Sequence, residues 1–266
     1  METETKNMFS NIPGEKTPVS GSRIFIVLPA FNEALSIGTL LEHLDEAMKD
    51  AFLNYQTIVV DDGSTDRTSD IVNKYSDTIP VQIVRHPVNM GLGATIRDGL
   101  AAASKLASDK DIIITMDADD THTPGLILRM VRMIKEGYSV VIASRFQHES
   151  RVIGVPFHRQ LLSIAASILF RIIFPIPGVR DFTCGYRAYR ASVVKQAISH
   201  YGSLFLERDG FECMVDILLK LRKMNLIFGE APLLLRYDLK KGRTKMNVAK
   251  TIKNTLLLII RRKFHI

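Results

Sequence analysis

The sequence predicts an α/β fold in which helices cover both faces of a mainly parallel central sheet. Short apolar runs rich in β-branched residues alternate with longer segments whose leucines recur at helical spacing. This alternation is typical of right-handed βαβ units. Polar clusters follow directly after four of the apolar runs, at the edge where such sheets bind their ligands.

Strict alternation holds over the first half of the chain. Valine and isoleucine dominate the strand segments, as in strands that are covered on both faces. Strands are expected at 23–28, 55–60, 81–85, 111–116 and 138–144. Helices are expected between them at 34–50, 66–76, 92–106 and 124–137.

After Arg145 the alternation ends. The segments expected there are a loop at 147–160, an amphipathic helix at 161–174, a helix at 209–224, one bent or two short strands at 226–237, and a C-terminal helix. We interpret this half as an extension of the same domain, which spans residues 23–266. Residues 1–22 are polar, lack the apolar region of a secretory signal and are expected to form a flexible lead-in.

Composition and charge narrow the class of protein. The chain has 266 residues and a formal net charge of +7, which favours anionic partners such as nucleotide phosphates or an acidic membrane surface. It has no basic stripe interleaved with aromatic residues, so nucleic acid is not an expected partner. Cys184 and Cys213 form no CxxC pair, which argues against a disulfide framework or structural zinc and suits a reducing compartment. No apolar run is long enough for a membrane-spanning helix.

Three acids follow the predicted strand 111–116 in the stretch MDADD. Asp117 and Asp119 lie one residue apart, so in extended geometry their carboxylates approach a common ion. Mg²⁺ and Mn²⁺ prefer oxygen ligands and commonly bind through one or two carboxylates plus substrate phosphates. The pair therefore predicts a metal that neutralises charge on a diphosphate leaving group. The alternative role, capping the next helix, is already supplied by Thr123 and Pro124.

Further polar clusters follow the neighbouring strands. PAFNE contains Asn32 and Glu33, which either line a ligand pocket or begin a helix. DDGSTD contains Asp61 and Asp62, which either accept hydrogen bonds from a ligand or form a solvated turn. Gly91 opens a predicted helix without the spacing of a dinucleotide-binding fingerprint. It indicates either a close approach of the backbone to a ligand or a plain tight turn.

The ordered set of motifs resembles a known family. VLPAFNE, VVDDGSTDRT, NMGLGATIRDGL, MDADDTH and ASRF occur in the order and spacing of the family-two glycosyltransferases with the GT-A fold. The later segments DFTCGYRAYR, GFECMVDILLK and GRTKMNVAKTIK resemble the dolichol- and polyprenyl-phosphate mannosyl- or glucosyltransferases. The resemblance runs from Arg23 to the C-terminus. It implies a nucleotide-sugar half over 23–145 and an acceptor- and membrane-facing half over 146–266.

The resemblance also implies roles for individual residues. Asp117 and Asp119 are the expected ligands of Mg²⁺ or Mn²⁺. Many relatives carry Gln two residues after the second acid, where this chain has Thr121, so the third protein ligand differs. His122 either contributes to the metal site or is a surface histidine. The residues expected to contact the nucleotide donor are Pro29, Ala30, Asn32, Glu33, Asp61, Asp62, Gly91 and Asp117.

A phosphate acceptor and a hydroxyl acceptor need different catalytic groups. Its second pKa is about 6, so it is largely ionised near neutral pH and needs no general base, whereas a hydroxyl acceptor usually needs one. The site must instead hold two anions close together, a task that suits arginine. Arg145 and Arg159 are the expected catalytic cations beside Asp119, and Arg187 and Lys245 are the expected phosphate ligands of the acceptor. The implied reaction is a single in-line displacement that inverts the anomeric carbon.

The amphipathic helix expected at 161–174 has two interpretations. Its apolar residues pack into a core, or they lie in a membrane interface beside a lipid acceptor, which the resemblance favours. The C-terminal run LLLIIRRKFHI combines apolar and basic residues, as a peripheral anchor on an anionic leaflet does. The protein is therefore expected on the cytoplasmic face of a membrane, either peripherally or through a membrane-protein partner.

A different acceptor class provides the alternative function. A family-two enzyme that glycosylates a saccharide or another soluble acceptor needs a carboxylate base, for which Asp209 and Glu212 are the candidates. A sugar nucleotidyltransferase needs a glycine-rich, basic loop after the first strand, and PAFNE is not such a loop. Among donors, the resemblance favours GDP-mannose, with UDP-glucose next.

Overall fold

The secondary structure follows the predicted alternation in the first half of the chain. The computed structural model describes residues 21–208, 210–242 and 248–264. All nine segments predicted for the first half are confirmed, with ends that differ by a few residues. The strands are β1 (Ile24–Ala30), β2 (Tyr55–Asp61), β3 (Val81–Arg85), β4 (Ile112–Thr115), β5 (Val140–Ser144), β6 (Arg151–Ile153), β7 (Arg187–Arg190), β8 (Phe228–Pro232) and β9 (Leu234–Arg236). The helices are α1 (Ile37–Asp50), α2 (Thr68–Tyr75), α3 (Leu92–Leu106), α4 (Leu126–Lys135), α5 (Phe157–Ile173), α6 (Ala191–Tyr201), α7 (Cys213–Leu221) and α8 (Val248–Phe264), with the short 3-10 helices η1 (Gly202–Leu206), η2 (Arg222–Met224) and η3 (Tyr237–Leu239).

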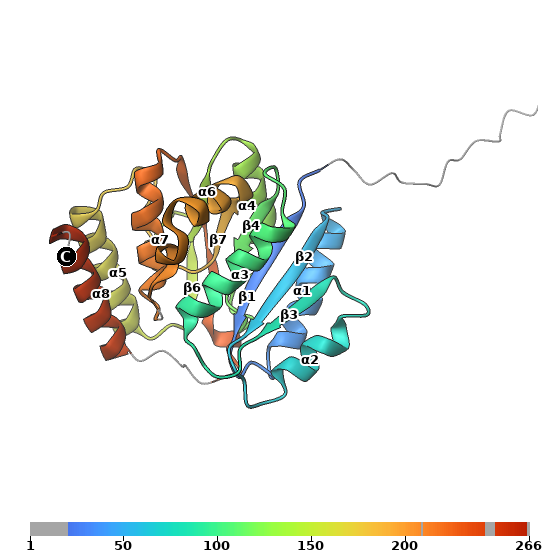
Figure 1. Cartoon of the computed structure of the whole chain (residues 1–266). Coiled ribbons are helices and arrows are strands. Elements are labelled where there is room, and N and C mark those ends of the chain that lie inside the picture. Colours follow the sequence, from blue (N-terminus) through green and yellow to red (C-terminus); the bar gives the residue numbers. More distant parts are fainter. Residues whose placement is uncertain (1–20, 209, 243–247, 265–266) are drawn as a thin grey trace, which may run out of the picture.

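The strands form two sheets (Figure 1). The central sheet has seven strands in the order β3-β2-β1-β4-β7-β5-β8, and β6 pairs with β9 in a separate two-stranded sheet. β1 to β4 run parallel, and β5 runs parallel to β8. β7 lies between β4 and β5 and is antiparallel to both. The mainly parallel sheet that the sequence predicts is therefore confirmed.

Three elements depart from the predicted pattern. β6 falls inside the predicted loop 147–160, and no element is predicted where β7 and α6 lie. The sequence of β7, RAYR, hides a strand because its arginines interrupt the apolar pattern. Arg187 is nevertheless fully buried, and its guanidinium donates to three backbone carbonyls. Those bonds compensate for burying the charge.

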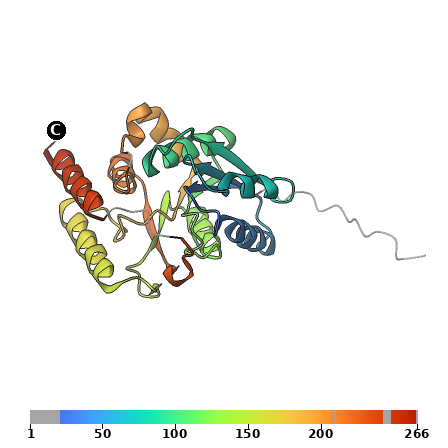
Figure 2. The same ribbon diagram turned by 90° about the horizontal axis from the view of Figure 1, so that it is seen from below.

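Helices cover both faces of the central sheet (Figure 2). α3, α6 and α7 lie on one face, and α1 and α4 lie on the other. β4 and β5 are fully buried between these layers. α3 approaches β1 closely at Gly99, where a Cβ atom would lie only 2.3 Å from Cγ1 of Val27. A larger residue at Gly99 would therefore force α3 away from the sheet.

α5 and α8 lie side by side outside the central sheet (Figure 1, Figure 2). Within α5 only Ser167 and Phe170 are buried, so packing into a core, one of the two interpretations of this helix, is wrong for most of its length. Within the described ranges, no helix is both long enough and apolar enough to cross a bilayer. The large apolar side chains that the two helices expose are Phe157, Leu161, Leu162, Ile164, Ile168, Leu169 and Ile172 of α5 and Leu256, Leu257 and Ile260 of α8.

Candidate active site

Three strand ends bring polar segments to one edge of the central sheet. β1 lies between β2 and β4 and runs parallel to both. The segments that follow Ala30, Asp61 and Thr115 therefore leave the sheet on the same side. Pairing continues past the strands, because the backbone N–H of Asp62 donates to the carbonyl of Ala30 at 2.8 Å. The clusters PAFNE, DDGSTD and DADD thus adjoin one another.

Asn32 joins the first cluster to the second. Its backbone has a left-handed φ of 52°, and its N–H donates to Ser64 Oγ at 2.8 Å. Its side-chain oxygen accepts hydrogen bonds from the backbone N–H groups of Thr65 at 2.8 Å and Asp66 at 3.3 Å. Asparagine tolerates a positive φ and satisfies the amides of turns. It therefore shapes the wall between the two loops, and its contact with a donor stays a prediction.

Asp61 and Asp62 are bound inside the protein. Asp61 is fully buried and accepts hydrogen bonds from the backbone N–H of Ser64 at 2.9 Å and from the Ser69 hydroxyl. Asp62 is also buried and accepts a hydrogen bond from the backbone N–H of Gly91 at 2.9 Å. The carboxylate of Asp61 has no exposed surface in this structure, and contact of Asp61 and Asp62 with the donor stays a prediction. Both aspartates order the loops around them.

The remaining predicted donor residues lie at the ends of these loops. Ala30 is buried and Pro29 is partly exposed at the end of β1. Gly91 precedes α3 with a φ of 93°, a backbone conformation that favours glycine. Its amide donates to Asp62, which favours the tight-turn interpretation, and its contact with the donor stays a prediction. Donor contact by Pro29 and Ala30 stays a prediction.

The two acids of the predicted metal pair have different surroundings. Asp119 accepts a hydrogen bond from the Thr121 hydroxyl at 2.7 Å and forms an ion pair with the Lys240 ammonium. Burial opposes its charge, but the charge and hydrogen bond of Lys240 outweigh burial and lower the pKa of Asp119. Asp117 keeps 49% of its side chain exposed. Removal from bulk water, together with the negative charges of Asp119 and Glu33, raises the pKa of Asp117.

Glu33, Asp117 and Asp119 form what we call the acidic corner. Their negative charges favour the binding of a cation. In the structure the Lys240 ammonium supplies one at Asp119. His122 is buried, so the prediction of a surface histidine is wrong. Its Nδ1 lies 4.0 Å from Asp117 Oδ2 and has no hydrogen-bond partner among the described residues, which leaves that nitrogen available to a ligand.

The residues present fit a divalent ion that is completed by substrate. Across residues 21–208, 210–242 and 248–264, no three His, Cys, Asp or Glu side chains are grouped as a ready-made metal site. Mg²⁺, however, commonly binds through one or two carboxylates and fills its shell with phosphate oxygens and water. Asp117 and Asp119 supply that pair, whereas the Thr121 hydroxyl is buried and donates to Asp119. In this structure Thr121 thus supports Asp119 through a hydrogen bond.

The third acid of DADD faces elsewhere. Asp120 has a left-handed φ of 59°, and its Oδ1 lies 3.2 Å from Nδ1 of His43 in α1. This backbone conformation separates Asp120 from its neighbours. The stretch thus offers two carboxylates to the acidic corner, although the sequence contains three in four residues.

Arg145 is held beside Asp117. Its guanidinium forms a two-pronged ion pair with Asp181, from Nε to Oδ2 at 2.8 Å and from Nη2 to Oδ1 at 2.7 Å. Burial opposes the charge of Asp181, but Arg145 holds the pKa of Asp181 below its usual range. The pKa of Arg145 is raised despite burial, chiefly by Asp181 and in part by the negative charge of Asp117. Asp181 therefore orients a permanent cation next to the predicted metal ligand.

A row of side chains runs from the acidic corner to α5. Lys240, paired with Asp119, lies 5.8 Å from the ring centroid of Tyr237. Arg159 lies over the same ring at 5.6 Å and donates from Nη1 to the Tyr237 hydroxyl at 2.8 Å. Arg159 belongs to the first turn of α5. We call Asp119, Lys240, Tyr237 and Arg159 the corner-to-helix row. The sequence predicts its two ends but not Lys240 or Tyr237, because DLKKGRTK indicates only a basic loop.

Two other predicted residues, Arg187 and Glu212, are buried and bonded to neighbouring groups. Arg187 is fully buried and donates to the carbonyls of its surroundings, so its predicted role as a phosphate ligand is wrong. Glu212 is buried, and its Oε1 accepts a hydrogen bond from Asn254 Nδ2 at 3.0 Å. Lys245 and Asp209 lie outside the described residues.

The segment that matches a known protein family contains most strands of the central sheet. The model of glycosyl transferase family 2 matches residues 25–197. The chain belongs to this family. The predicted family membership is thereby confirmed, and the matched region contains both Asp117 and Asp119 together with Arg145 and Arg159.

Relatives of this family 2 glycosyltransferase include enzymes named for lipid-linked mannose. The chain is 32% identical over 199 residues to a dolichol-phosphate mannosyltransferase of Pyrococcus furiosus, which covers 74% of the chain and 53% of that protein. The chain thus spans about half the length of that relative. It is 27% identical over 197 residues to a polyprenol monophosphomannose synthase of Mycolicibacterium smegmatis, which covers 70% of the chain and 72% of that protein.

Solved structures confirm the GT-A fold of this family 2 glycosyltransferase. Glucosyl-3-phosphoglycerate synthase from Mycobacterium tuberculosis, in complex with phosphoglyceric acid, superposes with a TM-score of 0.64 at 20% identity. The superposition covers 91% of this chain and 80% of that chain. Complexes of the same synthase contain UDP with Mn²⁺ or with Mg²⁺. At this identity the likeness establishes the fold alone.

Proposed function

We propose that this glycosyltransferase transfers a hexose from a nucleotide sugar to a polyprenyl phosphate at a membrane surface. Mannose is the favoured sugar, because relatives carry the names dolichol-phosphate mannosyltransferase and polyprenol monophosphomannose synthase. GDP-mannose is therefore the donor we propose first, with UDP-glucose next. The observation that carries the proposal is the corner-to-helix row. It connects the acidic corner, which suits the donor, to an exposed amphipathic helix, which suits a lipid acceptor.

Asp117 and Asp119 are the residues that would hold Mg²⁺ or Mn²⁺. A divalent ion supplies positive charge to a diphosphate leaving group. Arg145 and Lys240 add two protein cations beside the same carboxylates. Cations placed between a donor diphosphate and an acceptor phosphate reduce the repulsion between the two anions, most strongly where water is partly excluded. These side chains therefore bring two anionic substrates together.

The acceptor phosphate supplies its own nucleophile. One of its oxygens attacks C1 of the hexose while the bond from C1 to the diphosphate oxygen breaks, so C1 is inverted and the nucleoside diphosphate leaves. Because a phosphate monoester is largely ionised near neutral pH, no proton has to be removed. We propose that Arg145 and Arg159 attract and orient the acceptor phosphate, Arg145 through its permanent charge while Asp181 occupies its Nε and Nη2.

The substitution Glu212→Gln is expected to leave turnover within about threefold of wild type, as for a residue outside the chemistry. The measurement is the rate of mannose transfer from GDP-mannose to a short polyprenyl phosphate, with donor and Mn²⁺ affinities measured separately. Asn254→Ala is the matched control, because it breaks the Glu212–Asn254 hydrogen bond and keeps the carboxylate. If Glu212→Gln lost turnover while Asn254→Ala did not, and donor and Mn²⁺ still bound normally, Glu212 would be established as a required base.

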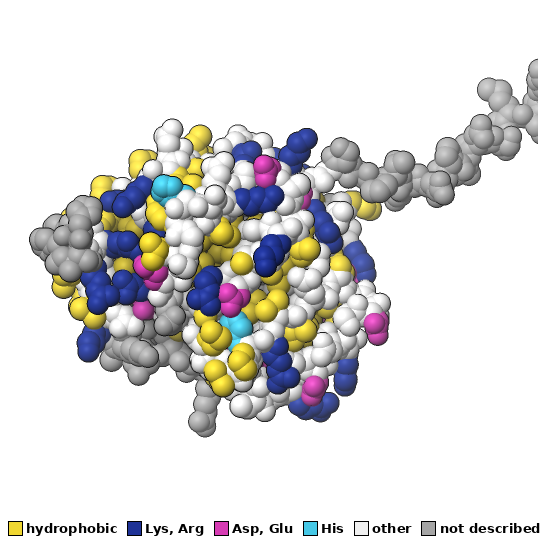
Figure 3. All heavy atoms as spheres, in the orientation of Figure 1, with side chains coloured by type: hydrophobic (Ala, Val, Ile, Leu, Met, Phe, Trp, Pro, Cys, Tyr) yellow, Lys and Arg dark blue, Asp and Glu magenta, His cyan; other side chains and the backbone are white. Residues whose placement is uncertain are grey.

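The exposed faces of α5 and α8 support the membrane part of the proposal. Phe157 and Ile172, near the two ends of α5, are 73% and 75% exposed. Figure 3 shows Lys and Arg side chains among apolar ones on the left of the molecule, where Figure 1 draws α8. An apolar helix face flanked by cations is typical of helices that lie in the interface of an anionic membrane. We infer that the protein binds peripherally to a cytoplasmic leaflet, alone or with a membrane-protein partner.

The double substitution Phe157→Ser/Ile172→Ser is expected to weaken binding to anionic liposomes about a hundredfold, since each large apolar side chain that is buried contributes roughly 1.5 kcal/mol or more. Flotation with phosphatidylglycerol liposomes measures the effect. The matched control is Phe52→Ser/Ile227→Ser, which changes the same residue types at positions that are 80% and 61% exposed outside α5 and α8. Equal flotation of the two double variants would contradict the proposed role of α5.

The second candidate function is transfer to a soluble acceptor with Glu212 as the base. The observation in its favour is that Glu212 Oε2 is buried and has no hydrogen-bond partner among the described residues. One experiment separates the two functions. The purified protein is incubated with Mn²⁺, GDP-mannose or UDP-glucose, and either a short polyprenyl phosphate or 3-phosphoglycerate, and the products are identified by mass. A glycolipid product supports the proposal, and a glycosylated soluble acceptor replaces it.

A further inference from the structure

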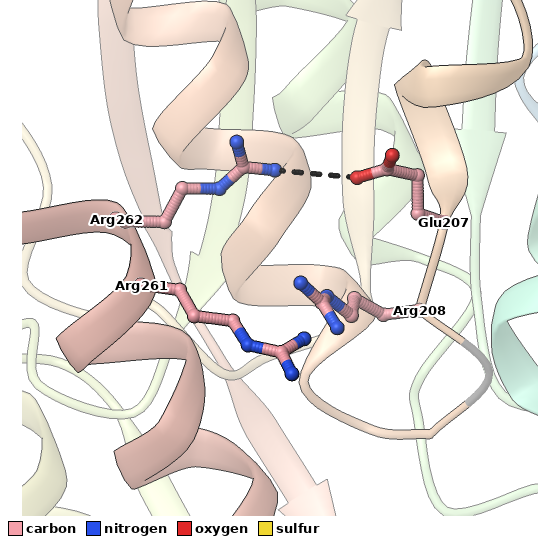
Figure 4. A pocket seen from close by; sticks show the side chains of 4 residues that line it. All are labelled: Glu207, Arg208, Arg261 and Arg262. Carbon is pink, nitrogen blue, oxygen red and sulfur yellow. Dashed lines mark ion pairs between the residues drawn. The ribbon is translucent and has the colours of Figure 1, made fainter. Parts of the chain in front are cut away.

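A pocket lined by arginines lies outside the acidic corner and the corner-to-helix row. It has a volume of about 380 Å³ and is lined by Glu207, Arg208, Arg261 and Arg262. Glu207 and Arg208 follow η1, and the other two arginines belong to α8. Figure 4 shows the guanidinium groups of Arg208 and Arg261 pointing into the same space. The pocket is large enough for a phosphate-bearing headgroup.

The nearby carboxylates are already engaged by other cations. Asp216 is buried and lies 2.7 Å from both Arg262 Nη2 and Lys220 Nζ. Glu207 lies 3.8 Å from Arg262 Nη2 and 3.7 Å from Lys220 Nζ. The negative charges of Asp216 and Glu207 thus offset the positive charges of Arg262 and Lys220. The charges of the other two pocket arginines are not offset by these carboxylates.

Arg208 and Arg261 are those two arginines. Neither forms an ion pair with any residue in the part of the chain that the structure describes. Nε of Arg208 is shielded from solvent and has no hydrogen-bond partner among the same residues. An unpaired buried N–H is costly, and two guanidinium groups that share a pocket repel each other. The repulsion is relieved when an anion binds between the two guanidinium groups.

We propose that this pocket binds a phosphate group, separately from the donor and acceptor phosphates of the transfer reaction. Guanidinium groups bind phosphate through two parallel charge-assisted hydrogen bonds, and Arg208 and Arg261 approach the pocket from different elements. The pocket adjoins α8, whose Leu256, Leu257 and Ile260 are exposed apolar side chains. The phosphate is therefore that of an anionic lipid headgroup at the membrane surface. This choice of source rests on the proposed membrane contact of α8, whereas the phosphate site itself does not.

The test compares Arg208→Gln/Arg261→Gln with Arg129→Gln/Arg132→Gln. The second variant removes the same two charges from the exposed surface of α4. Binding is measured to phosphatidylcholine vesicles with and without phosphatidylglycerol, and calorimetry measures binding of inorganic phosphate. Removing the two pocket arginines is expected to weaken binding to phosphatidylglycerol vesicles about tenfold or more, because each basic residue near an anionic surface contributes to attraction. The α4 variant is expected to bind like wild type.

Two other outcomes would overturn the headgroup assignment or the phosphate site itself. If the pocket variant loses binding of inorganic phosphate but binds vesicles like wild type, the site takes a soluble phosphate and the headgroup assignment is overturned. If both variants match wild type with both probes, the phosphate site itself is overturned. Thermal unfolding checks the fold, and the single substitution Arg261→Gln, at an exposed position of α8, replaces the double variant if that variant is unstable.

Mannose transfer in detergent separates this inference from the proposed function. The variant Arg208→Gln/Arg261→Gln is expected to transfer mannose to a short polyprenyl phosphate at the wild-type rate, because the pocket shares no residue with the acidic corner. A loss of transfer in this variant would show that the pocket serves the acceptor itself and would overturn the separation. An absence of transfer by every protein, wild type included, would contradict the proposed function and leave the vesicle comparison intact.

Discussion

The substitution Asp119→Asn is expected to lower kcat for sugar transfer about a thousandfold, the loss typical of removing a group that stabilises charge in the transition state. Asparagine keeps the shape of the side chain and can still accept the hydrogen bond from Thr121. It removes the negative charge that holds Lys240 in the structure and that would hold a divalent ion. The measurement is the transfer rate at increasing Mn²⁺ concentration, together with the Mn²⁺ affinity of the free protein.

Asp120→Asn is the matched control for this prediction. It makes the same chemical change one residue away, at a carboxylate that faces His43 and not the acidic corner. Asparagine also suits the left-handed backbone of this position. Turnover is expected to stay within about threefold of wild type. Equal losses in the two variants would show that the acidic stretch acts through its total charge, and the assignment of Asp119 as a metal ligand would be wrong.

Replacement of the buried arginine, Arg187→Leu, is expected to lower the free energy of unfolding by about 4 kcal/mol. The guanidinium donates to the carbonyls of Cys184 at 2.8 Å, Met214 at 2.6 Å and Phe182 at 2.8 Å. Leucine leaves these three acceptors without their donor inside the protein and opens a void where the longer side chain was. Urea unfolding measures the change, and the melting temperature is expected to fall by about 10 °C.

Arg129→Leu provides the control for charge and size. Arg129 lies on α4 with 54% of its side chain exposed and pairs with the exposed Glu149, so its replacement is expected to change stability by less than about 0.5 kcal/mol. The prediction for Arg187 fails if Arg187→Leu unfolds at the wild-type urea concentration but no longer uses the phosphate acceptor. That result would restore the phosphate role that the burial of Arg187 contradicts.

The two unpredicted strands, β6 and β7, share a physical cause. β7 carries arginine at both ends of a four-residue strand, so its sequence has neither the apolar run of a buried parallel strand nor a clean alternation. It is a strand because β4 and β5 pair with it on both sides. β6 has three residues, and its sheet partner among the described strands is β9, far along the chain. Local pattern is weak evidence where pairing decides the structure.

The residues of the candidate site also fall into two groups: those that a local sequence pattern predicts and those that distant contacts place. Asp117 and Asp119 are predictable because an acidic pair directly after a buried strand is a local signal. The position of Lys240 is not predictable, because it lies 121 positions along the chain from its partner Asp119. The burial of Asp61 is also not predictable from local pattern. Its place at a strand end suggests a ligand contact, but the loop that follows folds back and buries its carboxylate.

The sequence by itself determined the fold class, the family and the carboxylate pair at the tip of β4, because periodicity and motif order are properties of neighbouring residues. Tertiary structure alone decided which charges face the site. It turned Asp120 toward α1, buried Arg187 among carbonyls and placed Lys240 and Tyr237 between Asp119 and Arg159. The physical reason is that a charged side chain settles where distant parts of the chain supply its partner, and no local pattern records that partner.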